Sequence, residues 1–272
     1  MATHIEQAYQ MLVDFTDFLF PGRPAPSVQT TVLQLRNHLE LEDLIGKEGY
    51  AGFYVRRGVW GRPTMVAHGD LTDETRQTLY HEATHRILDH HARLAGPWLH
   101  EGLARYFESL TVRDGQARLG EIPDTIHIGP NGFQPYMLPG VKDLLTASYE
   151  RFHNDDNPDR AKAPIEAANY TGAWGLVHLL NNGTEGYRPR FLQLLQALTT
   201  GASMAEAWQA GFAGVSLNTI EHHYRSHFAI SDSVVFLTPY QLPKVKAPEV
   251  VEVPHATVTS MLTSIHRGMQ RD

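Results

Sequence analysis

The chain has 272 residues, a formal net charge of −7 and 42% hydrophobic residues, enough to bury a sizeable core in one large domain or two lobes. It contains no cysteine, which excludes disulfides and thiolate metal ligands, so any bound zinc must use His, Asp or Glu. Acidic and basic residues are mixed along the sequence without a basic patch, and we therefore expect no nucleic-acid partner.

The first third of the sequence alternates between predicted helices and short predicted strands. We expect a helix at 5–20, a strand at 27–35, a short helix at 38–45 and strands at 51–55 and 64–68. Acidic residues interrupt the apolar positions of the first helix, which is unlike a signal peptide. No apolar run approaches the roughly 18 residues of a membrane span. We expect no membrane span and, unless a longer precursor was trimmed, a cytoplasmic location.

The remainder of the sequence is predicted to be mainly helical. Thr72 is a suitable N-cap for a long helix that runs to about residue 94, where Gly96-Pro97 stops it. A second helix is expected at 99–110, and the Gly- and Pro-rich residues 113–140 are expected to form loops with short strands. Further helices are expected near 141–152, 165–182, 188–200, 204–229 (broken around Gly211 and Gly214) and 256–269.

The long predicted helix carries the sequence His81-Glu82-Ala83-Thr84-His85, an H-E-x-x-H motif. Residues four apart lie on one face of a helix, about 6 Å apart along its axis, so His81 and His85 can bind the same ion. Glu82 lies one residue round the helix, where it is poorly placed as a ligand but can face a water held by the metal, as a general base must. The motif predicts a zinc hydrolase, most often a peptidase.

Two residues compete for the third ligand position. His91 follows His81 by ten residues, the spacing of the H-E-x-x-H-x-x-G-x-x-H class, but Leu88 replaces the glycine that turns the chain in that class. In an unbroken helix His91 would lie about 9 Å beyond His85 along the axis. Glu101 follows the Gly-Pro break, which lets a second helix return, and it completes a set of two histidines and a glutamate with one position left for water. The pattern favours Glu101.

These motifs resemble those of a known group of enzymes. His81-Glu82-x-x-His85 together with the segment Trp98-Leu99-x-Glu101-Gly102-Leu103-Ala104 is similar to the gluzincin metallopeptidases, and aminopeptidase N relatives carry a similar W-L-x-E-G sequence. The nearest likeness is to a bacterial family of peptidase-MA-like domains, in which G-F-Y, here residues 52–54, precedes the motif helix. The resemblance covers about residues 28–228, although the interval between His85 and Glu101 is shorter here than in the aminopeptidases.

The order of the predicted elements indicates an α+β fold, and the resemblance implies that this fold is zincin-like. A small mixed sheet and the active-site helix would form an N-terminal lobe over residues 1–96, followed by a helical lobe over 97–230. Residues 1–230 would act as one catalytic domain, and a Pro-punctuated C-terminal extension would occupy 231–272. The resemblance also implies that an extended substrate pairs with an edge strand just before the motif helix, for which we expect residues 64–68.

The segment Tyr170-Thr171-Gly172-Ala173-Trp174 extends the resemblance to the aminopeptidase segment that presents a tyrosine to the transition state. Carried over, Tyr170 would donate its phenol O–H to the developing oxyanion. His178, two turns later, is interpreted as a core histidine, with a catalytic role as the alternative.

Two further pairs of polar residues are weaker candidates. Asp89 and Glu108 are candidates to orient a ligand imidazole, with a solvated or capping role as the alternative. His223 and His227 have i, i+4 spacing but no carboxylate nearby, which predicts a polar helix face.

The sequence therefore predicts a zinc-dependent peptidase that acts on a peptide or protein substrate. A G-x-M-E-N segment of the kind that binds a free amino terminus is absent, which favours an endopeptidase. Two alternatives remain open: a non-catalytic zinc-binding or interaction module on a peptidase scaffold, and a zinc amidase with a non-protein substrate.

Overall fold

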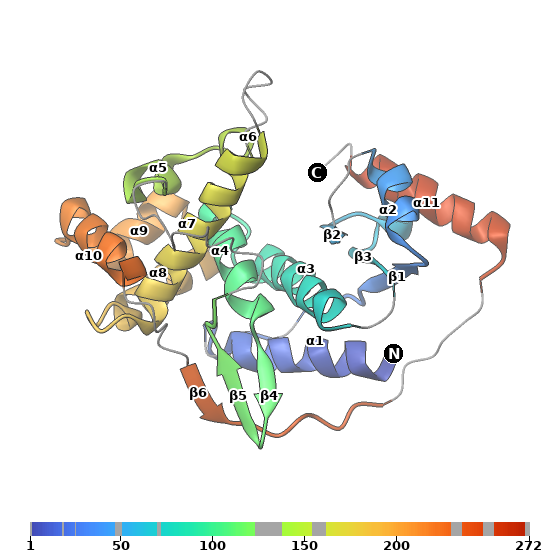
Figure 1. Cartoon of the computed structure of the whole chain (residues 1–272), viewed down its shortest axis with the longest axis horizontal. Helices are drawn as coiled ribbons and strands as arrows, with labels where there is room; N and C mark the ends of the chain where they lie inside the picture. Colours follow the sequence, from blue (N-terminus) through green and yellow to red (C-terminus); the bar gives the residue numbers. More distant parts are fainter. Residues whose placement is uncertain are drawn as a thin grey trace. The chain divides into compact units, whose positions relative to one another are not determined.

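The computed structural model describes residues 2–17, 19–24, 26–46, 51–69, 72–122, 138–153, 162–229, 236–246 and 253–269. The chain divides into two compact units, residues 1–90 with 242–272 and residues 91–241. Each unit combines helices with one three-stranded sheet (Figure 1), so the protein is α+β, as the sequence predicts. Among the described residues, no helix combines the length and apolar character that crossing a membrane requires.

The first unit is built around a small mixed sheet. Its elements are α1 (Ala2–Asp17), β1 (Thr31–Leu35), α2 (His38–Ile45), β2 (Gly52–Val55), the 3-10 turn η1 (Val59–Gly61), β3 (Thr64–His68), α3 (Asp73–His91) and α11 (His255–Met269). β3 is the central strand, parallel to β1 and antiparallel to β2. The expectation that residues 64–68 form a substrate-binding edge is therefore wrong, because both edges of β3 already bond to neighbouring strands.

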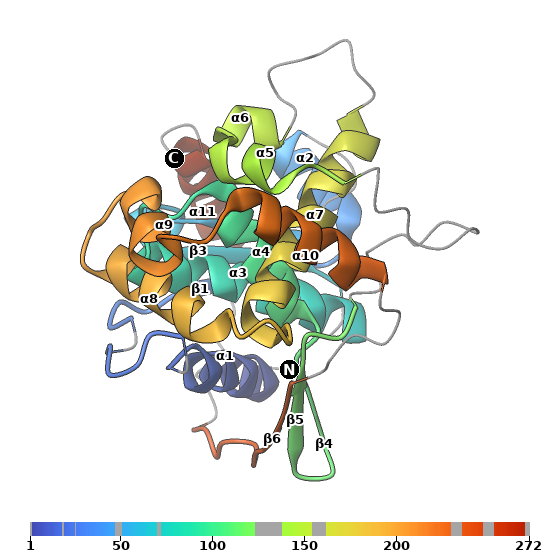
Figure 2. The ribbon, with the colours of Figure 1, turned by 90° about the vertical axis from the view of Figure 1, so that its left-hand side faces the viewer.

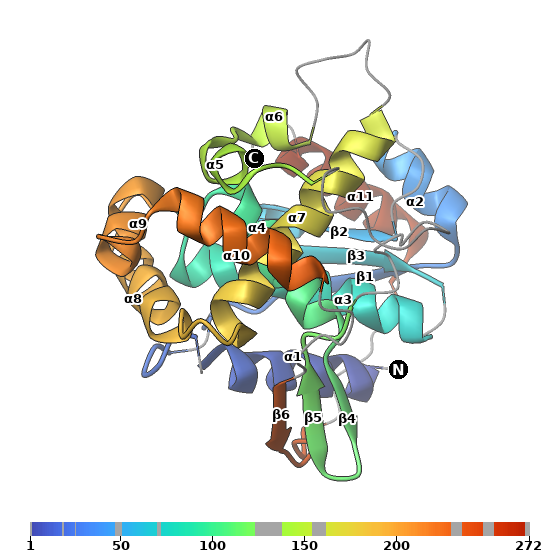
Figure 3. The same ribbon diagram turned by 60° about the vertical axis from the view of Figure 1, so that its left-hand side comes forward.

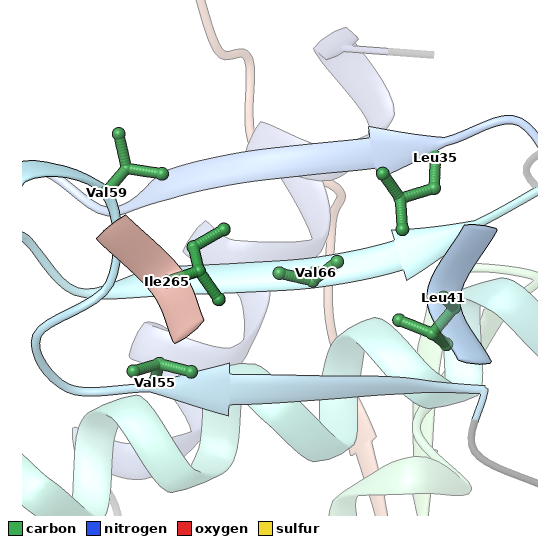
Figure 4. Packing of buried hydrophobic residues seen from close by; sticks show 6 residues of the cluster. All are labelled: Leu35, Leu41, Val55, Val59, Val66 and Ile265. Carbon is green, nitrogen blue, oxygen red and sulfur yellow. The ribbon is translucent and has the colours of Figure 1, made fainter. Parts of the chain in front are cut away.

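One face of this sheet packs against two helices that are far apart in sequence. Figure 4 shows the fully or nearly fully buried cluster, which comprises Leu35, Leu41, Val55, Val59, Val66 and Ile265. Ile265, on α11, is 0% exposed. Beside it the Ser264 hydroxyl donates to the carbonyl oxygen of Gly58 and accepts the backbone N–H of Trp60, both at 2.9 Å. The last helix of the chain thus completes the core of the N-terminal sheet.

β2 and the residue that follows it contact α3. The Tyr54 hydroxyl donates to Asp89 Oδ2 at 3.2 Å, and Arg56 Nη2 lies 2.6 Å from Asp89 Oδ1. A Cβ at Gly52 would lie 2.7 Å from the side chain of Thr78 on α3 and 2.6 Å from a backbone oxygen of β3, so only glycine fits there. These contacts fix the helix that carries the H-E-x-x-H motif against the sheet.

The second unit is mainly helical. Its elements are α4 (Pro97–Glu108), β4 (Thr111–Arg113), β5 (Gln116–Leu119), α5 (Val141–Thr146), α6 (Tyr149–Phe152), α7 (Lys162–Asn182), α8 (Arg188–Thr199), α9 (Met204–Phe212), α10 (Leu217–Ala229) and β6 (Phe236–Pro239). The strands form an antiparallel sheet in the order β4-β5-β6, visible as the hairpin and its partner in Figure 2. α8 and α9 lie side by side, and α10 packs on α7 (Figure 3).

Several predicted boundaries in this unit differ in detail from the structure. The helix expected at 141–152 is two short helices, α5 and α6, because residues 147 and 148 are extended. The break expected around Gly211 and Gly214 is confirmed, since α9 ends at Phe212 and α10 begins at Leu217. Of the loop region expected at 113–140, residues 123–137 lie outside the described part of the chain.

A close helix crossing organises the second unit. A Cβ at Gly102 on α4 would lie 2.6 Å from the carbonyl oxygen of Ala173 and 2.7 Å from Val177 Cγ2, both on α7. Backbone cannot give way as a flexible side chain can, so glycine is required for this approach. The crossing brings α4 and α7 together at the residue next to Glu101, and Tyr170 lies on the same α7 helix one turn before Ala173.

Candidate metal centre

α3 provides two histidines with converging ring nitrogens. The Thr72 hydroxyl accepts the backbone N–H of Thr75 at 3.2 Å and caps the start of the helix. Two turns later, the Nε2 atoms of His81 and His85 lie 3.0 Å apart. Ligands about 2.0 Å from a tetrahedral ion lie roughly 3.3 Å from one another, so these two nitrogens are suitably spaced to bind one ion.

α4 provides the third candidate ligand. Trp98 and Leu99, both 0% exposed, anchor the start of the helix in the core, and Glu101 is itself only 3% exposed. One ligand atom each from His81, His85 and Glu101 lies within 4.8 Å of the other two. The three residues therefore form a possible metal-binding group, and its two imidazoles and one carboxylate are donors that suit zinc.

His91 is not part of this group. α3 continues as a helix through Leu88, which is 1% exposed, and ends only at His91. The chain therefore does not turn back at Leu88, which is the condition that the competing ligand class requires.

The two residues expected to act on the substrate lie on α3 and α7. Glu82, next to His81, is buried with 8% exposure. Tyr170, on α7, is half-buried, and the guanidinium of Arg105 lies 5.0 Å from the centre of the Tyr170 ring. Burial first, and then the negative charges of Glu101 and Glu166, raise the pKa of Tyr170 far above its ordinary value, while Arg105 opposes the shift. The phenol therefore keeps its proton at neutral pH.

The structure adds two residues that the sequence analysis did not single out. His153 follows α6, and its Nδ1 lies 3.3 Å from the Tyr170 hydroxyl and 3.5 Å from Glu166 Oε1. Its Nε2 lies 3.9 Å from Glu101 Oε1. The i, i+4 spacing of Glu166 and Tyr170 on α7 was the only sequence signal for this cluster; nothing in the sequence around His153 points to it.

The weaker candidates make contacts of their own. Asp89 contacts Tyr54, which lies on β2, and Arg56, which follows that strand. Glu108 pairs with Arg105, whose Nη1 lies 3.3 Å from Glu108 Oε2. His223 Nδ1 lies 2.8 Å from the Tyr187 hydroxyl, so His223 makes a specific side-chain contact and is more than part of a solvated helix face.

His178 belongs to a buried polar network that joins α4, α7 and α10. The Tyr106 hydroxyl donates to Asn182 Oδ1 at 2.9 Å, and Asn182 Nδ2 faces His178 Nε2 at 3.4 Å. His178, which is 0% exposed, places Nδ1 2.6 Å from His227 Nε2. Because the Asn182 amide is a donor, His178 Nε2 accepts and its Nδ1–H donates to His227. The network requires both imidazoles to be neutral, which supports the core interpretation of His178.

This network should make the protein less stable in acid. Burial lowers the pKa of His227, with Glu185 opposing the shift. The unfolded chain therefore takes up a proton below about pH 6.5 that the folded chain refuses, and the free energy of unfolding falls as the pH drops through this range, by at most about 1.4 kcal/mol per pH unit from one group. Urea unfolding at pH 7.5 and 5.0 measures the loss. The variant His227→Gln should reduce this loss of unfolding free energy, whereas the variant His222→Gln, at an exposed histidine of the same helix, should leave it unchanged. An equal loss in both variants would contradict the assignment of the pH dependence to His227.

Comparison with known proteins finds one family. Residues 76–203 match the family described as a protein of unknown function, DUF1570. The match includes His81, His85, Glu101 and Tyr170, and it covers a little under half of the chain. No curated protein matches the sequence. The chain is thus similar to this family over the segment that holds the candidate metal ligands.

Proposed function

We propose that the protein is a zinc-dependent peptidase of the gluzincin type with a zincin-like catalytic fold. The observation that carries the proposal is the convergence of ligand atoms from His81, His85 and Glu101 to within 4.8 Å, with the buried Glu82 next to the first ligand. Two features of the fold support the zincin-like assignment. The motif helix contacts a small mixed sheet, and a mainly helical part begins with the helix that carries Glu101.

His81, His85 and Glu101 would hold the zinc ion, which when bound acidifies water and polarises a carbonyl group. The Glu82 carboxylate takes the proton of the attacking water and passes it to the nitrogen of the leaving amine. Tyr170 donates its O–H to the oxygen of the tetrahedral carbon, where negative charge develops. Its high pKa suits this role, because a donor must keep its proton until the charge appears.

An extended peptide would add to the sheet at β2. β3 bonds on both edges, whereas β2 pairs on one edge only among the described residues. β2 also contacts α3 through Gly52 and Tyr54, which places its backbone beside the motif helix. Backbone pairing with an unpaired strand edge binds peptides with little regard to sequence, which agrees with an endopeptidase.

Zinc titration of the full chain, combined with a peptide-library cleavage screen, tests this proposal. Glu101→Ala should weaken zinc binding by about 100-fold or more, because it removes a ligand, whereas His91→Ala should bind as tightly as the wild type. The reverse order of the two variants would move the site to the class with a histidine as third ligand. Tight zinc binding without cleavage of any peptide would instead support a non-catalytic zinc module.

A further inference from the structure

His153 occupies a position between Tyr170 and the ligand Glu101. It lies just after α6, where its backbone N–H bonds back to the carbonyl oxygens of Arg151 and Tyr149. Its side chain is 13% exposed, and its ring lies 5.8 Å from that of Tyr170 in an edge-on arrangement. It is not one of the three residues whose ligand atoms cluster within 4.8 Å. The imidazole therefore stands beside the ligand group and is not part of it.

Two contacts converge on one nitrogen of this imidazole. Nδ1 lies 3.3 Å from the Tyr170 hydroxyl and 3.5 Å from the Glu166 carboxylate. The negative charge of the Glu166 carboxylate favours the tautomer with the proton on Nδ1, and the nearer Tyr170 oxygen is the hydrogen-bond partner of that N–H. The other nitrogen, Nε2, is buried and has no hydrogen-bond partner among the described residues. Glu101 Oε1 is too distant from it, at 3.9 Å. A proton on Nε2 would leave a buried N–H unsatisfied, which proteins avoid.

The direction of the hydrogen bond determines what Tyr170 can do. If Nδ1 carried no proton, the phenol would donate its O–H to His153, and this O–H could not donate to a substrate. With the proton on Nδ1, the phenol oxygen accepts, and the phenol's own O–H is free to donate elsewhere. We propose that His153 is a positioning residue: the charge of Glu166 keeps the imidazole proton on Nδ1, and this N–H fixes the phenol oxygen of Tyr170 and leaves the phenol proton for the substrate. This inference rests on the proposed peptidase function.

A double-mutant cycle tests the role of His153 in turnover. His153→Ala should lower kcat about tenfold, with KM and zinc affinity within about twofold of wild type, because only the placement of Tyr170 is lost. In a Tyr170→Phe background the same change should lower kcat less than about twofold, since the group that His153 positions is already gone. If the kcat of the double variant falls by the full product of the two single-variant losses, the proposal is wrong. A wild-type protein that cleaves no peptide would overturn the proposed function as well.

Two conservative variants separate positioning from packing. Asn carries its amide on Cγ, as His carries Nδ1, so His153→Asn should restore kcat to within about threefold of wild type. His153→Gln, which places its amide further out, should behave like His153→Ala. Equal rates in the Asn and Gln variants would contradict the inference.

A measurement that needs no turnover examines the hydrogen bond itself. In the nitrogen-15 NMR spectrum of the metal-free full chain, Nδ1 of His153 should carry the proton, and Tyr170→Phe should shift the Nδ1 resonance while leaving that of the exposed His222 unchanged. A proton found on Nε2 would overturn the proposal, whether or not the protein is a peptidase.

Discussion

Glu82→Gln should bind zinc as tightly as the wild type and hydrolyse peptides about a thousandfold more slowly. Glutamine has nearly the same size as glutamate and fits the same buried position, so the proposed ligand histidines on α3 are not disturbed. Its amide cannot accept the proton of the attacking water, and the proposed general base is lost. Metal analysis and kcat for the best peptide of the cleavage screen, measured on the same preparation, give both results.

The control for this variant is Glu42→Gln, the same chemical change at a partly buried glutamate on α2 in the same unit. Its rate should remain within about threefold of wild type, because Glu42 lies outside the proposed machinery. If Glu82→Gln with a full complement of zinc cleaves as fast as the wild type, the general-base role of Glu82 is wrong.

Local patterns predicted the elements well, and strand order less well. Thr72, which caps α3, and the Gly96-Pro97 pair, which begins α4, are short-range signals. The helix between them ends at residue 91, where an end near residue 94 was expected. The central position of β3 had no such signal, because the sequence alternation of a strand is the same whether one edge or both are paired. A final helix was expected at 256–269, but its periodicity does not reveal that Ile265 packs against a sheet more than 190 residues earlier in the chain.

The same distinction applies to the candidate site. The proximity of His81 and His85 follows from helix geometry alone. Glu101 was found because the Gly-Pro pair before it separates two predicted helices. His153 follows Glu101 by 52 residues and shares no element with it. Its contact with Tyr170 depends on how the chain after α6 packs against α7, which is tertiary structure that a single sequence does not encode in any periodic form.

The contribution of α11 to the first unit gives the largest expected effect on stability. Ile265→Asp should destabilise the protein by about 5 kcal/mol or more. Losing the buried Ile side chain alone costs roughly 2–5 kcal/mol. The new carboxyl group would also be surrounded by the apolar side chains of Leu41, Val55 and Val66, which adds a desolvation penalty. A loss of this size equals the whole stability of many domains. Urea unfolding followed by circular dichroism measures it.

Ser260→Asp provides the matched control, because it introduces the same charge at an exposed position of the same helix and should change stability by less than about 0.5 kcal/mol. Amide hydrogen exchange then locates the damage. Protection of β3 should fall in Ile265→Asp, because the apolar face that α11 covers becomes open to water. Unchanged protection of β3 together with an unchanged urea midpoint would mean that the sheet keeps its core without this helix, and that residues 255–269 are dispensable for the first unit.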